Sequence, residues 1–430
     1  MSPELIGLLG IITLFILMAA GLPISFAMIV PSFFGFLIFL GWDATLINMI
    51  SILSNYVSSY TMSVVPVFIF MGQLAYLSGL LEELYGVSEK WLGRLPGGLA
   101  VSTVFANGIF AACSGSSLAA CIVIGKSAIP QMKKAGYDPL LTYGVVTASG
   151  TLAALIPPSI IICIYGLLVD ESISDLFIGG ILPGALSVFL YASYIVFRAR
   201  KFPRSTQRYS FKEKIVSVGD LWVVIILLVA IIGSIYFGWA TPTEAGSVGA
   251  VVVFFLALVT KRLTLKIFGD AVTNTVKTTG MILLIICAAA FFGRFLILAG
   301  TTEMIVQTVL MVDASRYVIF AMIGLVYLIL GCFLSATGMM VISLPIFYPV
   351  MMNLGFDPVW FGIIVVIFVE MALITPPVGM NIYAVSSIEP EISVTTIAKG
   401  AAFFLLMDIL TIIILTIFPE IVTFLPNLMR

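Results

Sequence analysis

Long apolar segments separated by short polar loops recur along the whole chain. Runs such as residues 5–20, 221–237 and 401–418 carry almost no charge and approach the ~20 residues needed to cross a bilayer. The pattern predicts about ten spanning helices. They cover residues 4–20, 23–41, 62–79, 140–168, 178–198, 221–239, 244–260, 277–299, 358–385 and 399–418.

Two segments near the N-terminus each allow two interpretations. Residues 44–58 fit either an interfacial helix or part of the third span. The run at 5–20 has no basic residue before it and no small-residue cleavage site after it. We therefore expect a retained first helix rather than a signal peptide.

Composition supports a membrane protein and argues against an enzyme. Of the 430 residues, 61% are hydrophobic and 10% are charged, and the mean hydropathy is +1.21; the surface of a soluble domain this apolar could not stay in water. Histidine is absent, and the five cysteines lie in apolar segments without a CxxC pair. A disulfide framework, a zinc or haem site and a catalytic cofactor are therefore not expected.

Basic residues predict the orientation. In this topology, 17 of the 20 lysines and arginines, all except Arg294, Arg316 and Arg430, fall on one face, in loops at 90–94, 126–134, 198–214, 261–277 and at Lys399. The positive-inside rule makes that face cytoplasmic. The N-terminus is then periplasmic, and the chain is a multi-pass protein of a bacterial inner membrane.

The charge pattern also predicts two re-entrant hairpins. The basic loops stay on one face only if residues 98–130 and 316–350 each enter and leave the membrane on the same side. If either segment spanned the bilayer once, the later basic loops would lie on the opposite face.

The two halves of the chain repeat each other. Gly72-Gln73 recurs as Gly293-Arg294, and 114–116 (Ser-Gly-Ser) as 335–337 (Ser-Ala-Thr), both at an offset of 293 − 72 = 221 residues. Beyond the tips, 136–139 matches 355–358 and 153–158 matches 372–377 at an offset of 355 − 136 = 219. An odd number of crossings separates the copies, so the second is inverted, which is typical of secondary transporters.

We therefore predict an all-α polytopic membrane protein with inverted repeats and an elevator-type ion-transporter fold. The expected divisions are scaffold helices at 1–61, a first repeat at 62–168 with hairpin 98–130, scaffold helices and a basic loop at 169–276, a second repeat at 277–385 with hairpin 316–350, and a C-terminal scaffold helix at 386–430.

Small polar residues interrupt both predicted hairpins, at Ser114-Gly115-Ser116-Ser117 and at 335–338. A helix break in hydrocarbon leaves carbonyls and hydroxyls that cost several kcal/mol each unless something binds them. Na⁺ would suit, because hard cations prefer oxygen ligands. The alternative is a notch of small residues for helix packing.

A broken helix follows each hairpin. Gly150-Thr151 and Pro157-Pro158 interrupt the first, and Thr375-Pro376-Pro377 with Gly379 and Asn381 interrupts the second. Proline pairs cannot continue the helical hydrogen bonds, so carbonyls are left free beside a cavity or an ion. The alternative is a simple proline kink.

Arg294 lies within an apolar segment, where the first repeat has Gln73. A buried cation there is costly and requires a partner. It could pair with Glu370 or Asp408, the acids within predicted spans, or with an anionic substrate.

Residues 237–246, Phe-Gly-Trp-Ala-Thr-Pro-Thr-Glu-Ala-Gly, resemble the signature of the large membrane (M) subunit of TRAP (tripartite ATP-independent periplasmic) transporters. The hairpin tips, both proline breaks and the basic central loop lie where that family has them. Within the signature, we expect Thr243 to cap a helix with Glu244 in its first turn, which is a structural role.

The resemblance implies sodium coupling, an elevator mechanism, a separate small four-helix membrane subunit and a periplasmic binding protein that delivers an organic anion, a carboxylate or a sulfonate. No nucleic-acid partner is expected. The motif match implies one sodium site at Ser114, Gly115, Ser116, Gly150, Thr151 and Pro157, and a second at Ser335, Thr337, Gly338, Thr375, Pro377 and Met380. Candidate substrate contacts are Arg294, Gln73, Asn381 and Ser117. The alternative function is a stand-alone sodium-coupled anion carrier or antiporter of the same fold.

Overall fold

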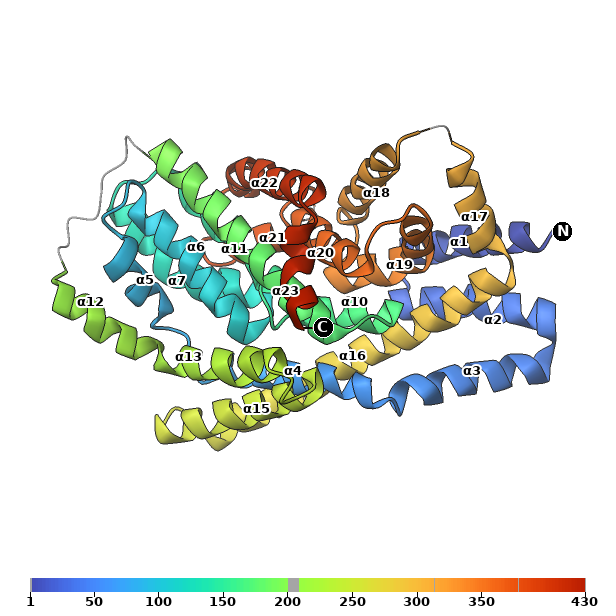
Figure 1. Cartoon of the computed structure of the whole chain (residues 1–430), viewed down its shortest axis with the longest axis horizontal. Helices are drawn as coiled ribbons and strands as arrows, with labels where there is room; N and C mark the ends of the chain where they lie inside the picture. Colours follow the sequence, from blue (N-terminus) through green and yellow to red (C-terminus); the bar gives the residue numbers. More distant parts are fainter. Residues whose placement is uncertain (1, 200–208, 313, 378, 430) are drawn as a thin grey trace.

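The computed structural model describes residues 2–199, 209–312, 314–377 and 379–429, which form helices and connecting loops without a β-strand (Figure 1). The part of the basic loop at 200–208 lies outside the described residues, as does Asp313. In the first half the helices are α1 (Pro3–Ala19), α2 (Ile24–Leu40), α3 (Trp42–Val57), η1 (Tyr60–Ser63), α4 (Val64–Leu77), α5 (Leu84–Leu92), α6 (Gly98–Ser114), α7 (Ser117–Lys134), α8 (Pro139–Ser149), α9 (Leu152–Leu155), α10 (Ile160–Val169) and α11 (Ile173–Arg198).

The second half continues the series after the central loop. Its helices are α12 (Phe211–Val218), η3 (Gly219–Leu221), α13 (Trp222–Leu228), η4 (Val229–Gly233), α14 (Ser234–Tyr236), α15 (Pro242–Val259), α16 (Leu265–Leu298), α17 (Thr301–Leu310), α18 (Arg316–Leu330), α19 (Ala336–Asn353), α20 (Pro358–Leu373), α21 (Met380–Ser386), α22 (Val394–Ile417) and α23 (Glu420–Met429).

Six of the described helical segments are long and apolar enough to cross a membrane, and two bent helix pairs raise the number to eight. The bends are 44° between α8–α9 and α10, and 47° between α12 and α13–α14. All ten predicted segments are helical, but α1, α2 and α20 have only 17, 17 and 16 residues. α19, which we predicted as half of a hairpin, is among the six.

The sequence fixes several helix starts through side-chain caps. Asp138 and Asp357 precede Pro139 and Pro358 at equivalent positions, and each carboxylate accepts a backbone N–H of the helix that follows. In the signature, the prediction that Thr243 caps the helix is wrong. The cap of α15 is Thr241, whose side chain and that of Glu244 bond reciprocally to each other's backbone N–H, with Pro242 in the first turn.

The repeat extends further than the sequence match indicated. Ser172 caps α11 and Ser393 caps α22, again 393 − 172 = 221 residues apart. The matching caps extend the repeat pattern to α11 and α22, which the predicted divisions place with the scaffold. The segment at 44–58 is the separate helix α3; its counterpart in the second half is continuous with the long helix α16.

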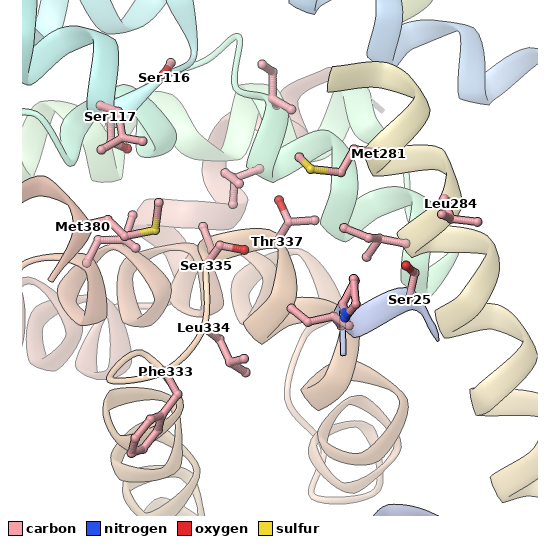
Figure 2. Close-up of a pocket in the computed structure, with 18 of the residues that line it drawn as sticks. Ser25, Ser116, Ser117, Met281, Leu284, Phe333, Leu334, Ser335, Thr337 and Met380 are labelled. Carbon is pink, nitrogen blue, oxygen red and sulfur yellow. The ribbon is translucent and has the colours of Figure 1, made fainter. Parts of the chain in front are cut away.

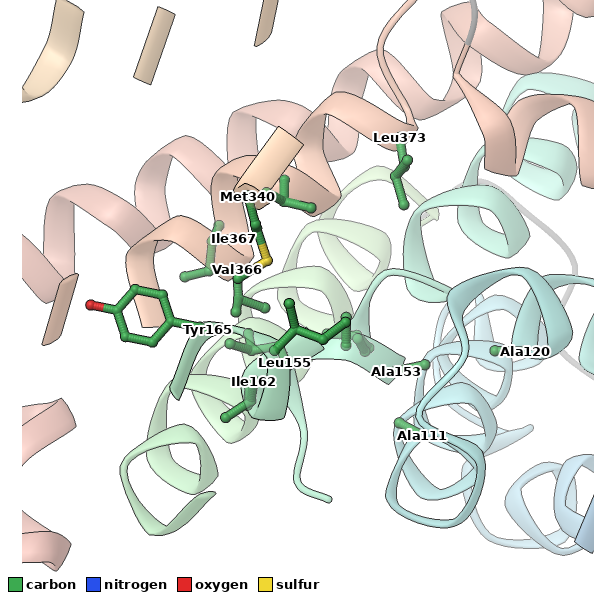
Figure 3. Packing of buried hydrophobic residues seen from close by; sticks show 14 of the residues in the cluster. Ala111, Ala120, Ala153, Leu155, Ile162, Tyr165, Met340, Val366, Ile367 and Leu373 are labelled. Atoms are coloured by element: carbon green, nitrogen blue, oxygen red, sulfur yellow. The ribbon is translucent and has the colours of Figure 1, made fainter. Parts of the chain in front are cut away.

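The two repeats meet at the centre of the molecule. In Figure 1, α5–α7 lie towards one end and α17–α19 towards the other, with α10, α20 and α21 between them. Figure 3 shows Leu155, Ile162 and Tyr165 of the first repeat packed near Met340 and Val366 of the second. The Tyr165 hydroxyl donates to the Pro358 carbonyl at 2.8 Å, so the interface is also hydrogen-bonded.

Candidate functional site

The first polar tip lies directly against the first broken helix. α6 ends at Ser114, and Gly115 turns the chain with a φ of +58°. A Cβ at Gly115 would lie 3.3 Å from the Pro158 carbonyl oxygen and 3.4 Å from the Ile160 amide nitrogen. Only glycine combines that φ with so close an approach.

The other side of this break is packed equally closely. A Cβ added to Gly150 would lie 2.2 Å from Cys121 Sγ and 3.1 Å from the Ser117 carbonyl oxygen. The neighbouring Thr151 is buried and donates its hydroxyl to the Ala148 carbonyl at 2.6 Å. The structure thus gathers the first predicted set, Ser114, Gly115, Ser116, Gly150, Thr151 and Pro157, around one tip.

The second tip and break are arranged in the same way. Ser335 caps α19 by accepting the Gly338 amide at 3.4 Å. Just before that cap, Cys332 Sγ donates to the Pro376 carbonyl at 3.7 Å. Just after α20, Thr375 donates its hydroxyl to the Met371 carbonyl at 2.7 Å. Both the Pro157–Pro158 and Pro376–Pro377 bonds are cis.

A cavity of about 620 Å³ lies between the two tips. Figure 2 shows Ser116 and Ser117 of the first tip, Ser335 and Thr337 of the second, and Met281 and Leu284 of α16 around it. The start of α2, with Ile24 and Ser25, forms another part of the wall.

Five helices begin at this cavity: α2, α7, α10, α19 and α21. The first-turn N–H groups of a helix lack partners within that helix, and its N-terminus carries a partial positive charge. The Ser116 and Ser335 hydroxyls each accept one such N–H, of Ala119 and Gly338. The convergence of N-termini favours an anionic ligand.

Of the four candidate substrate contacts, only Ser117 lines this cavity. Its hydroxyl donates to Glu370 Oε2 at 2.7 Å, and Glu370 is the single charged residue in the described lining. Met380, placed by the motif match in the second sodium set, also lines the cavity.

The other three candidates lie elsewhere. Gln73 accepts a hydrogen bond from Asn274 at 3.4 Å. Arg294 is exposed on α16, and the described structure gives it no ion pair with Glu370 or Asp408, so the ion-pair alternative is not found among the described residues. Asn381 is fully buried, and neither atom of its amide has a hydrogen-bond partner among the described residues.

Sequence reasoning missed three parts of the cavity wall: the start of α2, the residues of α16, and Glu370 as a lining residue. For α2 and α16 the contacts depend on tertiary packing between apolar helices, and no local motif marks them. Glu370 carried a signal, because an acid within an apolar helix is costly and usually functional.

A second polar cluster joins the end of α7 to the loop after α21. Lys133 Nζ lies 2.6 Å from Glu389 Oε2, and the Tyr143 hydroxyl donates to the same oxygen at 2.9 Å. The hydrogen bond from Lys133 is the main cause that lowers the pKa of Glu389 below its usual range. The cluster thus connects the first hairpin to the second repeat.

Glu389→Gln is expected to reduce thermal stability by less than about 1 kcal/mol near pH 7, because the pair is partly exposed. A carboxylate whose folded-state pKa is lowered stabilises the protein above its unfolded-state pKa of about 4.3, and this contribution is lost as the pH falls through the folded-state value. The melting curves of the wild type and of Glu389→Gln should therefore differ at pH 7 and converge in more acidic buffer. The control is Glu303→Gln, because Glu303 bonds to Gln307 on its own helix; a difference that persists in acid would contradict the prediction.

The exposed apolar surface and the broken helices indicate the class of protein. Large apolar side chains such as Ile38, Ile47 and Phe189 are 65%, 66% and 67% exposed, which suits lipid rather than water. Among the described residues, no group of three or more His, Cys, Asp or Glu side chains could hold a metal ion. Repeated broken helices that enclose a cavity are characteristic of secondary transporters, so the chain is a multi-pass membrane protein of the transporter class.

Comparison with known proteins gives the family. Residues 11–421 match the family described as tripartite ATP-independent periplasmic transporter, DctM component, and the chain belongs to this family. It is 35% identical over 371 residues to the C4-dicarboxylate TRAP transporter large permease protein DctM of Pseudomonas aeruginosa, covering 86% of each chain. The family and this relative are transporters and not enzymes, which confirms the prediction of a transporter rather than an enzyme.

The chain is also similar to a sialic acid permease and to a transporter of known structure. The chain is 31% identical to the sialic acid TRAP transporter permease protein SiaT of Haemophilus influenzae, with 86% of this chain and 60% of that protein covered. Among solved structures, the Alcanivorax borkumensis YdaH transporter matches with a TM-score of 0.62 at 16% identity, over 87% of this chain and 88% of that one. That likeness concerns the fold alone.

Proposed function

We propose that this chain is the substrate-translocating permease of a sodium-coupled TRAP system that imports a small organic anion. The observation that carries the proposal is the cavity of about 620 Å³ where five helix N-termini converge between two polar tips. Partial positive charge from several N-termini stabilises a carboxylate or sulfonate without a lysine or arginine in contact. Relatives named for C4-dicarboxylates and sialic acid support this class of substrate.

We further propose that sodium binds behind the tips, at the opposite ends of the broken helices. α6 and α9 end in the first region, and their counterparts α18 and α20 end in the second. Helix C-termini present unpaired carbonyls and a partial negative charge. The unpartnered amide of Asn381 adds a neutral oxygen beside the second region. These donors suit Na⁺, and their repetition in both halves favours two ions.

Alternating access would then occur by movement of the hairpins and broken helices as one body past α2, α15 and α16. The basic loops would face the cytoplasm of a bacterial inner membrane, with the N-terminus in the periplasm. A separate small four-helix membrane subunit would support the scaffold, and a periplasmic binding protein would deliver the anion.

The test is uptake into proteoliposomes that contain this chain, the small subunit and the loaded binding protein, with a radiolabelled C4-dicarboxylate and a radiolabelled sialic acid as probes. We expect uptake of one of them only when all three proteins and an inward sodium gradient are present. Uptake by the chain alone would support the stand-alone carrier instead. Uptake that is indifferent to the sodium gradient would refute sodium coupling.

A further inference from the structure

A second, much smaller cavity lies within the protein, behind the large one. Its volume is about 10 Å³, and its polar walls are Thr151, Ser187, Glu370 and Asp408. That volume is close to one water-sized sphere. Glu370 lines both cavities, so one side chain is common to the small cavity and to the site proposed for the anion.

The four polar residues form two symmetry-related pairs. Thr151 and Glu370 are 370 − 151 = 219 residues apart, and Ser187 and Asp408 are 408 − 187 = 221 apart, which are the two offsets of the inverted repeat. The small cavity therefore contains equivalent positions from both halves. The first repeat supplies a hydroxyl at each position and the second supplies a carboxylate.

The two carboxylates are buried and incompletely bonded. Glu370 and Asp408 are 4% and 6% exposed. Glu370 Oε2 accepts from Ser117, and Asp408 Oδ1 accepts from the Tyr191 hydroxyl at 2.7 Å. Asp408 Oδ2 is buried without a hydrogen-bond partner, and neither acid has an ion-pair partner among the described residues.

Two buried carboxylates without a positive charge are energetically costly, as is a buried oxygen without a donor. A small cation between them would relieve both costs. The cavity that both acids line has room for one atom-sized occupant. Carboxylate and hydroxyl oxygens are the ligands that hard cations prefer.

We propose that this cavity is a third cation site, in which Glu370 and Asp408, with the hydroxyls of Thr151 and Ser187, hold one dehydrated Na⁺. The choice of sodium rests on the proposed function, whereas the case for a cation rests on the two buried acids around one small cavity and on the unpartnered Asp408 Oδ2 atom. Because Glu370 also faces the large cavity, occupancy of this site would be coupled electrostatically to the bound anion.

The test is equilibrium binding of radiolabelled sodium to the purified full-length chain in lipid nanodiscs. Asp408→Asn and Glu370→Gln keep the side-chain shape and remove one charge each. We expect each variant to bind one sodium ion fewer per chain than the wild type. Asp43→Asn, which changes an exposed acid, should bind as many as the wild type.

Thermal melting in sodium-free buffer checks that the variants fold, and each should be at least as stable there as the wild type, since an uncompensated charge has been removed. Sodium should then stabilise the wild type more than either variant. An unchanged sodium count in both variants would overturn the third site while leaving the proposed function intact. A wild type that binds no sodium would overturn both.

Discussion

Thr375→Val is expected to raise the sodium concentration for half-maximal uptake by about ten- to a hundredfold. Valine has the same shape as threonine and replaces the hydroxyl oxygen with a methyl group. Thr375 donates its hydrogen to the Met371 carbonyl, so its oxygen lone pairs stay available at the second break. A hydrogen bond or contact to a charged partner contributes about 1.5–3 kcal/mol, and every 1.4 kcal/mol is about a factor of ten in affinity.

Thr416→Val is the matched control. Thr416 lies on α22 and donates to the Ile412 carbonyl at 2.7 Å, the same helical bond at the same distance as in Thr375. A loss of sodium affinity caused only by removal of that helical hydrogen bond would appear in both variants. The measurement is initial uptake rate against external sodium in proteoliposomes with the partner proteins. Equal sodium dependence in wild type and Thr375→Val would remove Thr375 from the proposed second sodium region.

Local chemistry in the sequence was sufficient to predict the helical class, both breaks and both tips. Two consecutive prolines end a helix whatever surrounds them, and Ser335 or Ser116 caps the helix that follows. The inverted repeat added the pairing of each tip with its own break, because equivalent residues at a constant offset must occupy equivalent positions. These features depend on a few neighbouring residues, so they can be predicted from one sequence.

Features that depend on contacts between distant helices could not be predicted in this way. Arg294 aligns with Gln73, but the alignment does not reveal that Arg294 is exposed and lies outside the cavity lining. The start of α2 lines the cavity because α2 packs on α16, and an apolar helix gives no sign of which neighbour it meets. The signature predicts a helix start with Thr243 as its cap and Glu244 in its first turn, whereas the reciprocal bonds form between Thr241 and Glu244.

Gly150→Ala is expected to destabilise the protein by about 1–3 kcal/mol and to abolish uptake, because the added methyl group overpacks a buried contact. The new Cβ would lie 2.2 Å from Cys121 Sγ, so α7 and α8 must separate at the first tip. That movement would displace the Ser117 carbonyl and the first sodium region together. Gly150 has an ordinary helical φ of −59°, so backbone strain does not contribute to the loss of stability.

Cys121→Ala provides the matched rescue. Removal of the sulfur clears the nearest obstacle, since the next contacts of the new methyl group are 3.1 Å and 3.5 Å. The single Cys121→Ala change should cost little more than its weak bonds to the Val146 and Thr147 carbonyls. In the double variant we expect about 0.5–3 kcal/mol of the loss to be recovered, together with part of the uptake. Additive losses in melting temperature would show that the tip and the break do not pack as one body, and the proposed joint movement would then fail.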